Sequence, residues 1–259
     1  MPSKPTILHA WPAFFVFLAL VFSAGGQVAG NPLFTGRAEK ELLRAQKFFQ
    51  VDTNDPAAAQ QLARASFELA ELSTNSPRQA EIARIGIEVC RQWLARASNS
   101  APGHYYLALN LGELAEAEAP SLAAYRRIYE VEREFQTAAA LDVRLDFAGP
   151  ARCLGLLYRD APGWPISIGS KRKTREWLDR AAALAPEFPE NQLNLAETHF
   201  KWRQMEETEK ALSRLAVIWP VAQTNLTGES WEKDWCDWNF RRQSVQSEFN
   251  CIFKPRNGR

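Results

Sequence analysis

Few residues in this chain are of the types that carry out catalysis or bind metals. Beyond residue 30 there are two histidines, His104 and His199, and each falls on a predicted helix without a cysteine or carboxylate at metal-ligand spacing. A Cys–His catalytic pair would require Cys153 to be exposed beside His199, but its apolar setting favours a buried thiol. The sequence also contains no phosphate-binding glycine loop, nucleophile elbow or paired zinc motif. We therefore expect no enzymatic activity, no metal and no cofactor.

A cluster of three bases, Lys171, Arg172 and Lys173, is a candidate binding feature. It follows Ser170, which is well placed to cap the next helix, and it fills the first turn of that helix. Positive charges there oppose the helix dipole, at about 0.3–1 kcal/mol each when exposed, whereas free N–H groups at a helix start bind anions. Two interpretations stay open. The cluster is either a site for an acidic partner, a carboxylate ligand or a phosphate headgroup, or a solvated group of charges.

An apolar loop precedes this cluster. Residues 158–170 read YRDAPGWPISIGS, in which two prolines stop the preceding helix and stiffen the chain. Trp164, Ile166 and Ile168 alternate with smaller or polar residues, so the loop must either fold onto the helices or present apolar side chains to a partner. Together with Tyr158, these three side chains are the candidate lining of an apolar pocket or a partner-binding surface.

The elements that position these residues are predicted to be helices throughout. Ala, Leu, Glu, Arg and Gln dominate the composition, while Val, Ile and Thr rarely occur in runs. Turns are indicated by stretches such as Asn54-Asp55-Pro56 and Asn75-Ser76-Pro77. The helical periodicity between such turns predicts helices over residues 37–51, 56–73, 78–98, 103–117, 120–139, 149–159, 171–185, 189–202 and 205–219.

One spacing template recurs along the chain. Three stretches share it: Cys90-x3-Leu94-x2-Ala97-x4-Pro102, Thr174-x3-Leu178-x2-Ala181-x4-Pro186 and Thr208-x3-Leu212-x2-Leu215-x4-Pro220. A leucine followed by a small residue recurs on the helices between them, at Leu111-Gly112, Leu154-Gly155 and Leu195-Ala196. This pattern resembles the tetratricopeptide repeat, in which small residues let the two helices of a hairpin approach and the hairpins stack. We therefore predict an all-α fold, an α-solenoid of degenerate TPR-like helical hairpins.

A second resemblance is narrower. Residues 149–158 (GPARCLGLLY), 161–169 (APGWPISIG) and 184–191 (LAPEFPEN), continuing to Glu197, resemble the T-component family of TRAP transporters over about 50 residues. The resemblance implies a periplasmic protein that associates with a solute-binding protein of a secondary transporter, and a ligand-holding pore has been proposed for such proteins. This chain departs from the lipoprotein members because no cysteine follows its N-terminal apolar segment.

The C-terminal segment, residues 227–259, is rich in tryptophan. Trp231, Trp235 and Trp238 are spaced i, i+4, i+7, which gathers three indoles on one helix face. A solenoid needs its last apolar face covered, so the segment is predicted to be a capping helix. The alternative is an exposed face that docks a partner.

Two cysteines in this segment, Cys236 and Cys251, form a candidate disulfide. Along one straight helix fifteen residues rise about 22 Å, whereas disulfide-bonded Cα atoms lie within about 7 Å. Pairing therefore requires the chain to fold back between them. The other two cysteines, Cys90 and Cys153, lie in apolar helical stripes and are expected to be buried thiols.

The first 30 residues are predicted to be a signal peptide. Lys4 precedes the apolar run AWPAFFVFLALVFSA, which is followed by small residues. About fifteen apolar residues are fewer than the roughly 20 that span a bilayer. The helical-repeat domain is then residues 31–226, in a protein exported to the periplasm or cell envelope. The alternative is that this segment is an uncleaved signal anchor, and in that case the protein would contact a membrane through it.

The charge balance excludes nucleic acid as a partner. The formal net charge is +1, and Lys4 is the one Lys or Arg among residues 1–30, so the remaining chain carries no basic excess. We predict a non-catalytic scaffold that binds another protein through its concave face and inserted loop. The alternative is a T-component-like protein that holds a small apolar or anionic ligand and associates with a solute-binding protein. A closed cavity beside the loop would favour the ligand holder, and an open groove would favour the protein binder.

Overall fold

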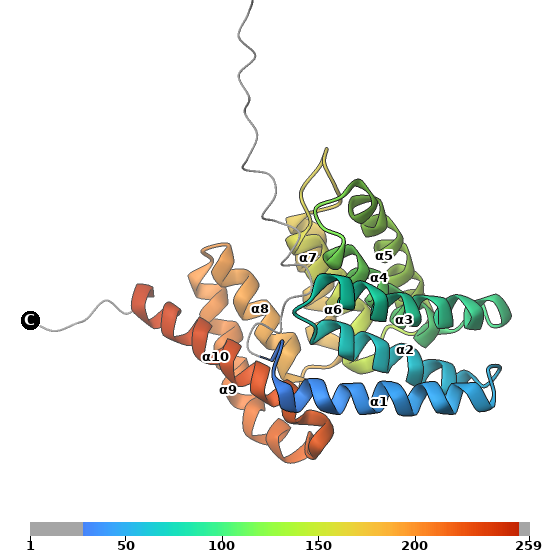
Figure 1. Ribbon diagram of the computed structural model, residues 1–259. Helices are drawn as coiled ribbons and strands as arrows, with labels where there is room; N and C mark the ends of the chain where they lie inside the picture. Colours follow the sequence, from blue (N-terminus) through green and yellow to red (C-terminus); the bar gives the residue numbers. More distant parts are fainter. Residues whose placement is uncertain (1–27, 254–259) are drawn as a thin grey trace, which may run out of the picture.

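Helices make up almost all of the structure, a computed structural model that describes residues 28–253. Figure 1 shows the helices packed in chain order, and no β-strand occurs in the described range. The all-α prediction is therefore confirmed. The helices of this range are α1 (Pro32–Val51), α2 (Pro56–Glu71), α3 (Ser76–Arg96), α4 (Ala101–Ala117), α5 (Leu122–Leu141), α6 (Leu145–Asp160), α7 (Lys171–Leu184), α8 (Pro189–Lys201), α9 (Met205–Asn225), the 3-10 helix η1 (Glu229–Trp231) and α10 (Glu232–Phe253).

Local capping signals decide where many of these helices begin. Several helices follow a side chain whose oxygen accepts a hydrogen bond from a backbone N–H of the first turn. These capping residues are Asn31, Asp55, Asn75, Ser100, Ser121 and Ser170. Because such signals are local, most predicted helix limits agree with the observed ones to within a few residues.

The helices form two layers of a curved row. The inner layer contains α2, α4, α6 and α8, which contact one another in succession, and α3, α5, α7 and α9 form the outer layer (Figure 1). Each inner helix pairs with the outer helix that follows it, which gives a series of hairpins. The leucine–small residue pairs lie on inner helices α4, α6 and α8, as the repeat template requires.

The small residues of the template are needed where helices approach. A Cβ atom at Gly155 on α6 would lie 2.5 Å from the Leu178 side chain of α7, which is too close for two carbon atoms. Leu178 is the leucine of the second template stretch and is buried. The hairpin α6–α7 therefore depends on the pairing of a large side chain with a residue that has none.

The proline predicted to close the last hairpin lies inside a helix instead. Pro220 is followed by a further turn, so α9 ends at Asn225 rather than at residue 219. Proline has no N–H to donate to the carbonyl four residues before it. The buried Trp219 and Ala222 pack on the core on either side of Pro220, and this packing offsets the missing hydrogen bond.

The C-terminal helix α10 does more than cap the last hairpin. It packs against α8 and α9, and its Trp235 ring meets Trp219 of α9 edge-on at 5.2 Å between centroids. Its first turns also cross the hollow of the curved row and reach the first helices, where Lys233 Nζ lies 2.5 Å from Glu71 Oε2 of α2. Trp231 is the last residue of η1, directly before α10, and contacts Trp238.

The candidate disulfide between Cys236 and Cys251 does not form. Both thiols are free and exposed, and α10 runs without a break between them. The fold-back that pairing requires is therefore absent. The continuous helix separates the two cysteines by about 22 Å along its axis.

The predicted signal peptide falls largely on residues 1–27, which lie outside the described residues. Val28 is buried in the core, and the Gly30 N–H donates a hydrogen bond to the Leu72 carbonyl at 3.0 Å. The folded domain therefore includes residues 28–30. In the part of the chain that the structure describes, no helix combines the length and apolar character needed to cross a membrane.

Candidate functional site

The inner face of the curved row encloses a groove of about 1250 Å³. Its walls come from α1, α2, α4, α6 and α8, with η1 and α10 on one side, and none of its lining residues belongs to α3, α5, α7 or α9. We call this space the concave groove. It is the natural binding surface of the fold because stacked inner helices present side chains along an extended hollow.

A strained turn at the start of α6 borders the groove. Asp146, Phe147 and Ala148 have φ angles of 51°, 52° and 64°, in the left-handed region. Such a conformation is unfavourable by about 1–2 kcal/mol for each non-glycine residue. The regular helix begins at about Gly149, as the sequence predicts, and the turn before it must be stabilised by its surroundings.

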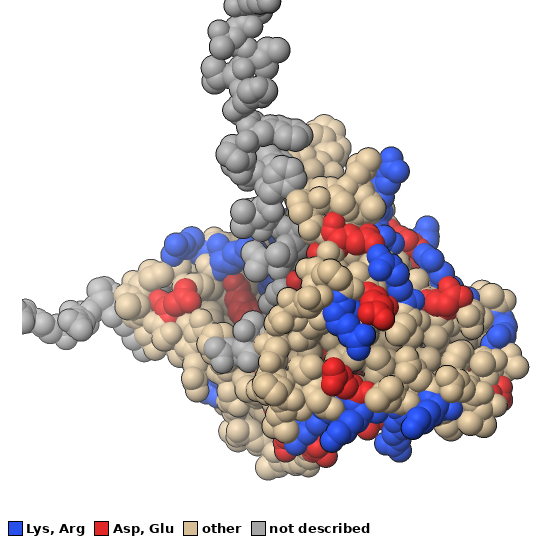
Figure 2. Space-filling view, viewed as in Figure 1, with Lys and Arg blue, Asp and Glu red and all other residues tan. Residues whose placement is uncertain are grey.

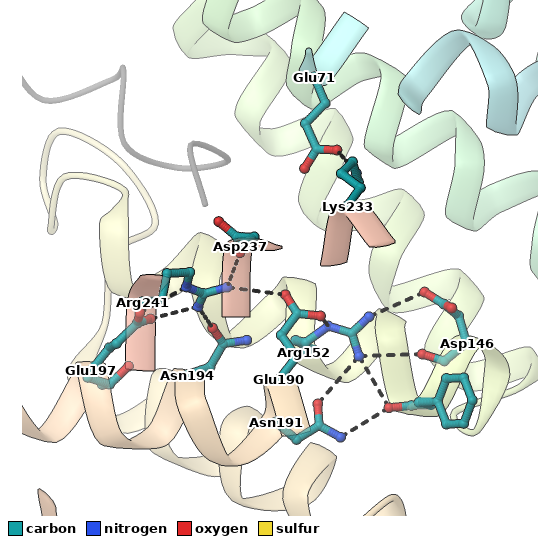
Figure 3. A network of polar contacts seen from close by, with 12 residues as sticks. Glu71, Asp146, Arg152, Glu190, Asn191, Asn194, Glu197, Lys233, Asp237 and Arg241 are labelled. Atoms are coloured by element: carbon teal, nitrogen blue, oxygen red, sulfur yellow. Dashed lines mark hydrogen bonds and ion pairs between the residues drawn. The ribbon is translucent and has the colours of Figure 1, made fainter. Parts of the chain in front are cut away.

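The side chain of Arg152 supplies much of that stabilisation. Its Nη1 donates to the Phe147 carbonyl at 3.2 Å, and its Nη2 lies 3.2 Å from Asp146 Oδ2 (Figure 3). Its Nε lies 3.2 Å from Glu190 Oε2 of α8. Asn191 Nδ2 adds a hydrogen bond to the Phe147 carbonyl at 3.1 Å. Arg152, only 6% exposed, therefore fixes the turn and connects α6 to α8.

A second buried arginine, Arg241 of α10, joins α10 to α8. Its Nη2 donates to Asn194 Oδ1 at 2.5 Å and lies 2.7 Å from Glu197 Oε2 (Figure 3). Its Nη1 lies 3.2 Å from Asp237 Oδ2 and 3.7 Å from Glu190 Oε1. Glu190 thus lies between the two arginines, and the polar contacts form one network along the floor of the concave groove.

Further ion pairs connect α10 and η1 to the opposite wall. Arg37 of α1 pairs with Glu229 at 2.7 Å and with Glu232 at 2.5 Å, in addition to the Lys233–Glu71 pair. These contacts join the first helices of the row to the last one. The curved row is therefore closed by the C-terminal segment, and the shape of the groove depends on it.

Aromatic rings form the apolar part of the groove wall. Phe147 stacks on Phe188 with 4.4 Å between centroids, and Trp231 and Trp238 meet Phe188 edge-on at 6.3 and 5.3 Å. The Arg152 guanidinium lies over the Phe188 ring at 5.1 Å. Trp231 and Trp238 thus line the groove, while Trp235 packs on Trp219 of α9, so the three tryptophans of the C-terminal segment do not form an exposed face.

Asp234 differs from the other acidic residues of the groove. Seven of the eight acidic lining residues in the described range pair with a cation, and Asp234 does not. Burial raises its pKa to about 7, with nearby carboxylates adding to the effect and Lys233 opposing it. Burial also raises the pKa of Asp237 to about 6, despite the Arg241 guanidinium beside it. Both groups therefore titrate near neutral pH.

The apolar loop residues do not line a common pocket. Tyr158 is 1% exposed, and its hydroxyl donates to Glu132 Oε1 at 2.5 Å. Ile168 packs against the core, whereas Trp164 is 89% exposed and Ile166 is 47% exposed. None of the four lines the concave groove. The loop thus follows both predicted alternatives: its base folds onto the helices and its tip is presented to solvent.

The three bases of the predicted cluster also diverge. Lys173 turns inward, 4.4 Å over the Tyr158 ring and 3.2 Å from Glu132. Lys171 lies over the Trp202 ring at 5.5 Å, and Arg172 pairs with Glu176 at 3.2 Å. The cluster does not converge on one anion. The predicted cap is present, since the Lys173 N–H donates to Ser170 Oγ at 3.3 Å.

The two histidines have hydrogen-bonding partners within the protein, and Cys90 and Cys153 are buried. His104 Nδ1 lies 2.6 Å from Glu134 Oε2, and His199 Nδ1 lies 2.9 Å from Gln204 Oε1. Burial raises the pKa of the Cys153 thiol to about 12, so it is protonated at neutral pH. Within residues 28–253 no group of His, Cys, Asp and Glu side chains could hold a metal ion.

Sequence reasoning missed the two buried arginines. Arg152 follows Ala151 and precedes an apolar run, and Arg241 lies three residues after the buried Trp238. A charged residue inside an apolar helical stripe indicates a buried ion pair, because an unpaired buried charge is strongly unfavourable. That signal was present, but the partners that join these arginines to α8, namely Glu190, Asn194 and Glu197, lie on another helix.

No family model matches the chain, and no curated protein matches it. The resemblances in the sequence therefore stay predictions.

Proposed function

We propose that this protein is a non-catalytic scaffold whose concave groove binds a segment of another protein. The observation that carries the proposal is the groove itself, about 1250 Å³ and walled by every inner helix together with α1 and α10. Pockets for small molecules have volumes of about 300–1000 Å³ and enclose most of the ligand. A larger hollow that extends along a row of helices fits an extended or helical segment of chain better.

The composition of the groove supports binding to protein. Aromatic residues and arginine are enriched at the centres of protein interfaces, and the groove is lined by the exposed Phe240 and the partly exposed Trp231, above the buried rings of Phe188 and Trp238. The charged side chains are mostly paired within the protein. A partner therefore meets a preorganised surface and does not have to order these side chains on binding.

Asp234 is the acidic lining residue of the described chain that is left available to the partner. It lines the groove and has no ion pair among the described residues. A lysine or arginine of the partner placed against it would favour the ionised form and lower its raised pKa. The proposed partner segment therefore carries a basic side chain among apolar ones.

The location and partner follow from the sequence and are part of the proposal. The apolar segment of residues 10–24, with small residues after it, favours export to the cell envelope. A periplasmic solute-binding protein is the first partner to test, because of the resemblance around residues 149–197. The ligand-holder alternative has less support, because the loop residues expected to hold the ligand lie outside the groove.

A blocked groove tests the proposal. Gln61 is exposed on α2 and lines the groove, so Gln61→Trp places a bulky ring in it. Arg214→Trp, at an exposed position of outer helix α9, is the matched control. Peptides are selected from a displayed random library against the wild-type chain, and their affinities are measured by calorimetry. We expect Gln61→Trp to weaken binding at least tenfold and Arg214→Trp to leave it unchanged. Equal affinity of the two variants would contradict the proposal.

A further inference from the structure

The loop between α6 and α7 is an ordered projection with an apolar tip. The Gly169 N–H donates to the Pro162 carbonyl and the Ser170 N–H to the Tyr158 carbonyl, both at 2.9 Å, which ties the two ends of the loop together. Trp164 and Ile166 lie between these bonds and are 89% and 47% exposed. Figure 1 shows the loop extending beyond the helices, and Figure 2 shows no charged side chain on its tip in that view.

Exposed cations flank the loop at the start of α7. Lys171, Arg172 and Arg175 follow directly from the loop and are exposed. Helical side chains tilt toward the helix N-terminus, which here is the end from which the loop projects. Lys171 and Arg175 lie over the Trp202 ring at 5.5 and 5.4 Å and form no ion pair with another described residue. Their charge is therefore available to an anionic surface.

The same edge of the protein receives the N-terminal end of the domain. The inner helices run parallel, so the turns inside the hairpins share one edge of the row. The Gly30 N–H bonds to the Leu72 carbonyl at the α2–α3 turn, and the α6–α7 loop is the corresponding turn two hairpins later. The start of the described domain and the apolar loop tip therefore lie at one edge of the row.

We propose that this edge docks on an anionic lipid bilayer, with Trp164 in the interface and the bases of α7 against the headgroup phosphates. Indole rings favour the membrane–water interface because they combine an apolar body with an N–H donor. Each Lys or Arg near an anionic surface strengthens binding about fivefold. A bilayer fits better than a protein pocket because the tip projects from the helices as an isolated apolar point with cations beside it. This proposal does not depend on what the concave groove binds.

The experiment places an environment-sensitive fluorophore on the loop of the full chain. Ile166→Cys is labelled in a Cys236→Ser, Cys251→Ser background, since those two thiols are exposed while Cys90 and Cys153 are buried. Val217→Cys on α9, exposed and distant from the loop in the chain, is the control label. The probes are phosphatidylcholine vesicles and vesicles in which roughly a quarter of the lipid is phosphatidylglycerol. We expect a blue shift from the loop label on the anionic vesicles and none from the control label.

Unlabelled variants give the binding strength by co-sedimentation. We expect Trp164→Ala to lower partitioning onto the anionic vesicles about tenfold and the Gln substitution of Lys171, Arg172 or Arg175 to lower it about fivefold each, with the charge effect lost at high salt. Val217→Ala is the matched apolar control. Two results would overturn the proposal. One is that Trp164→Ala and Val217→Ala both bind the vesicles as strongly as wild type, and the other is that the loop label of vesicle-bound protein shows no blue shift. These results would assign the tip to a protein contact or leave membrane binding to the N-terminal segment.

Discussion

Replacing Arg241 by methionine is the sharpest test of the polar network in the groove. Arg241 is 9% exposed and bonds to Glu197 at 2.9 and 2.7 Å, to Asn194 at 2.5 Å and to Asp237 at 3.2 Å. Methionine keeps much of the side-chain length but leaves these partners without a cation. Breaking a buried ion pair on one side destabilises a protein by about 3–5 kcal/mol, a large part of a typical stability of about 5–15 kcal/mol.

The assay is urea unfolding of wild type, Arg241→Met and the exposed-position control Arg214→Met at pH 8 and pH 5. At pH 8 we expect the full loss for Arg241→Met and a change within about 0.5 kcal/mol for the control. At pH 5 the loss should be smaller, because the abandoned Asp237 carboxylate takes up a proton. Asp237 has a pKa of about 6 even with the guanidinium in place, and removal of the cation raises it further. A loss below about 1 kcal/mol at pH 8, or an equal loss at both pH values, would refute the reasoning.

Three further predictions concern other parts of the fold. Asp234→Asn should stabilise the protein by roughly 1–3 kcal/mol at pH 8. Because the pKa of Asp234 is raised to about 7, the wild-type protein loses the stability contributed by the neutral carboxyl as pH rises through that value. The stability gained by Asp234→Asn should therefore grow between about pH 4 and pH 7. A gain independent of pH in urea unfolding would contradict this. Gly155→Ala should destabilise by about 1–3 kcal/mol, and less in a Leu178→Ala background, because its Cβ would meet Leu178 at 2.5 Å. Additive losses would show that the contact is not the cause. Cys236 and Cys251 should both react with a thiol reagent in the native, non-reduced protein, whereas an unreactive pair and a mass lower by two hydrogens would show a disulfide.

The hairpins could be predicted from sequence because their signals are local. A capping residue such as Ser170 and the helix that it starts are adjacent in the chain, and Gly155 and Leu178 are the small and large members of one repeat. The burial of Trp238 also follows from local spacing, since a helix face with three indoles must be covered.

The site could not be predicted in the same way, because its contacts are distant in sequence. Lys233 and Glu71 are 162 residues apart, and Arg241 and Asn194 are 47 apart. No periodicity shows that α10 crosses the groove to reach α2. The left-handed turn at Asp146 is equally hidden, because it is unfavourable locally and depends on Arg152 and Asn191.

The most direct test of the binding proposal is site-specific photo-crosslinking in cells that produce the protein. A photoreactive phenylalanine analogue replaces Phe240, an exposed aromatic residue that lines the concave groove, and in a second variant Val217 on the outer helix α9. The proposed function predicts a defined protein adduct from position 240 that is lost when Gln61→Trp is added, and no such adduct from position 217. Adducts from position 217 alone, or none from position 240, would contradict it.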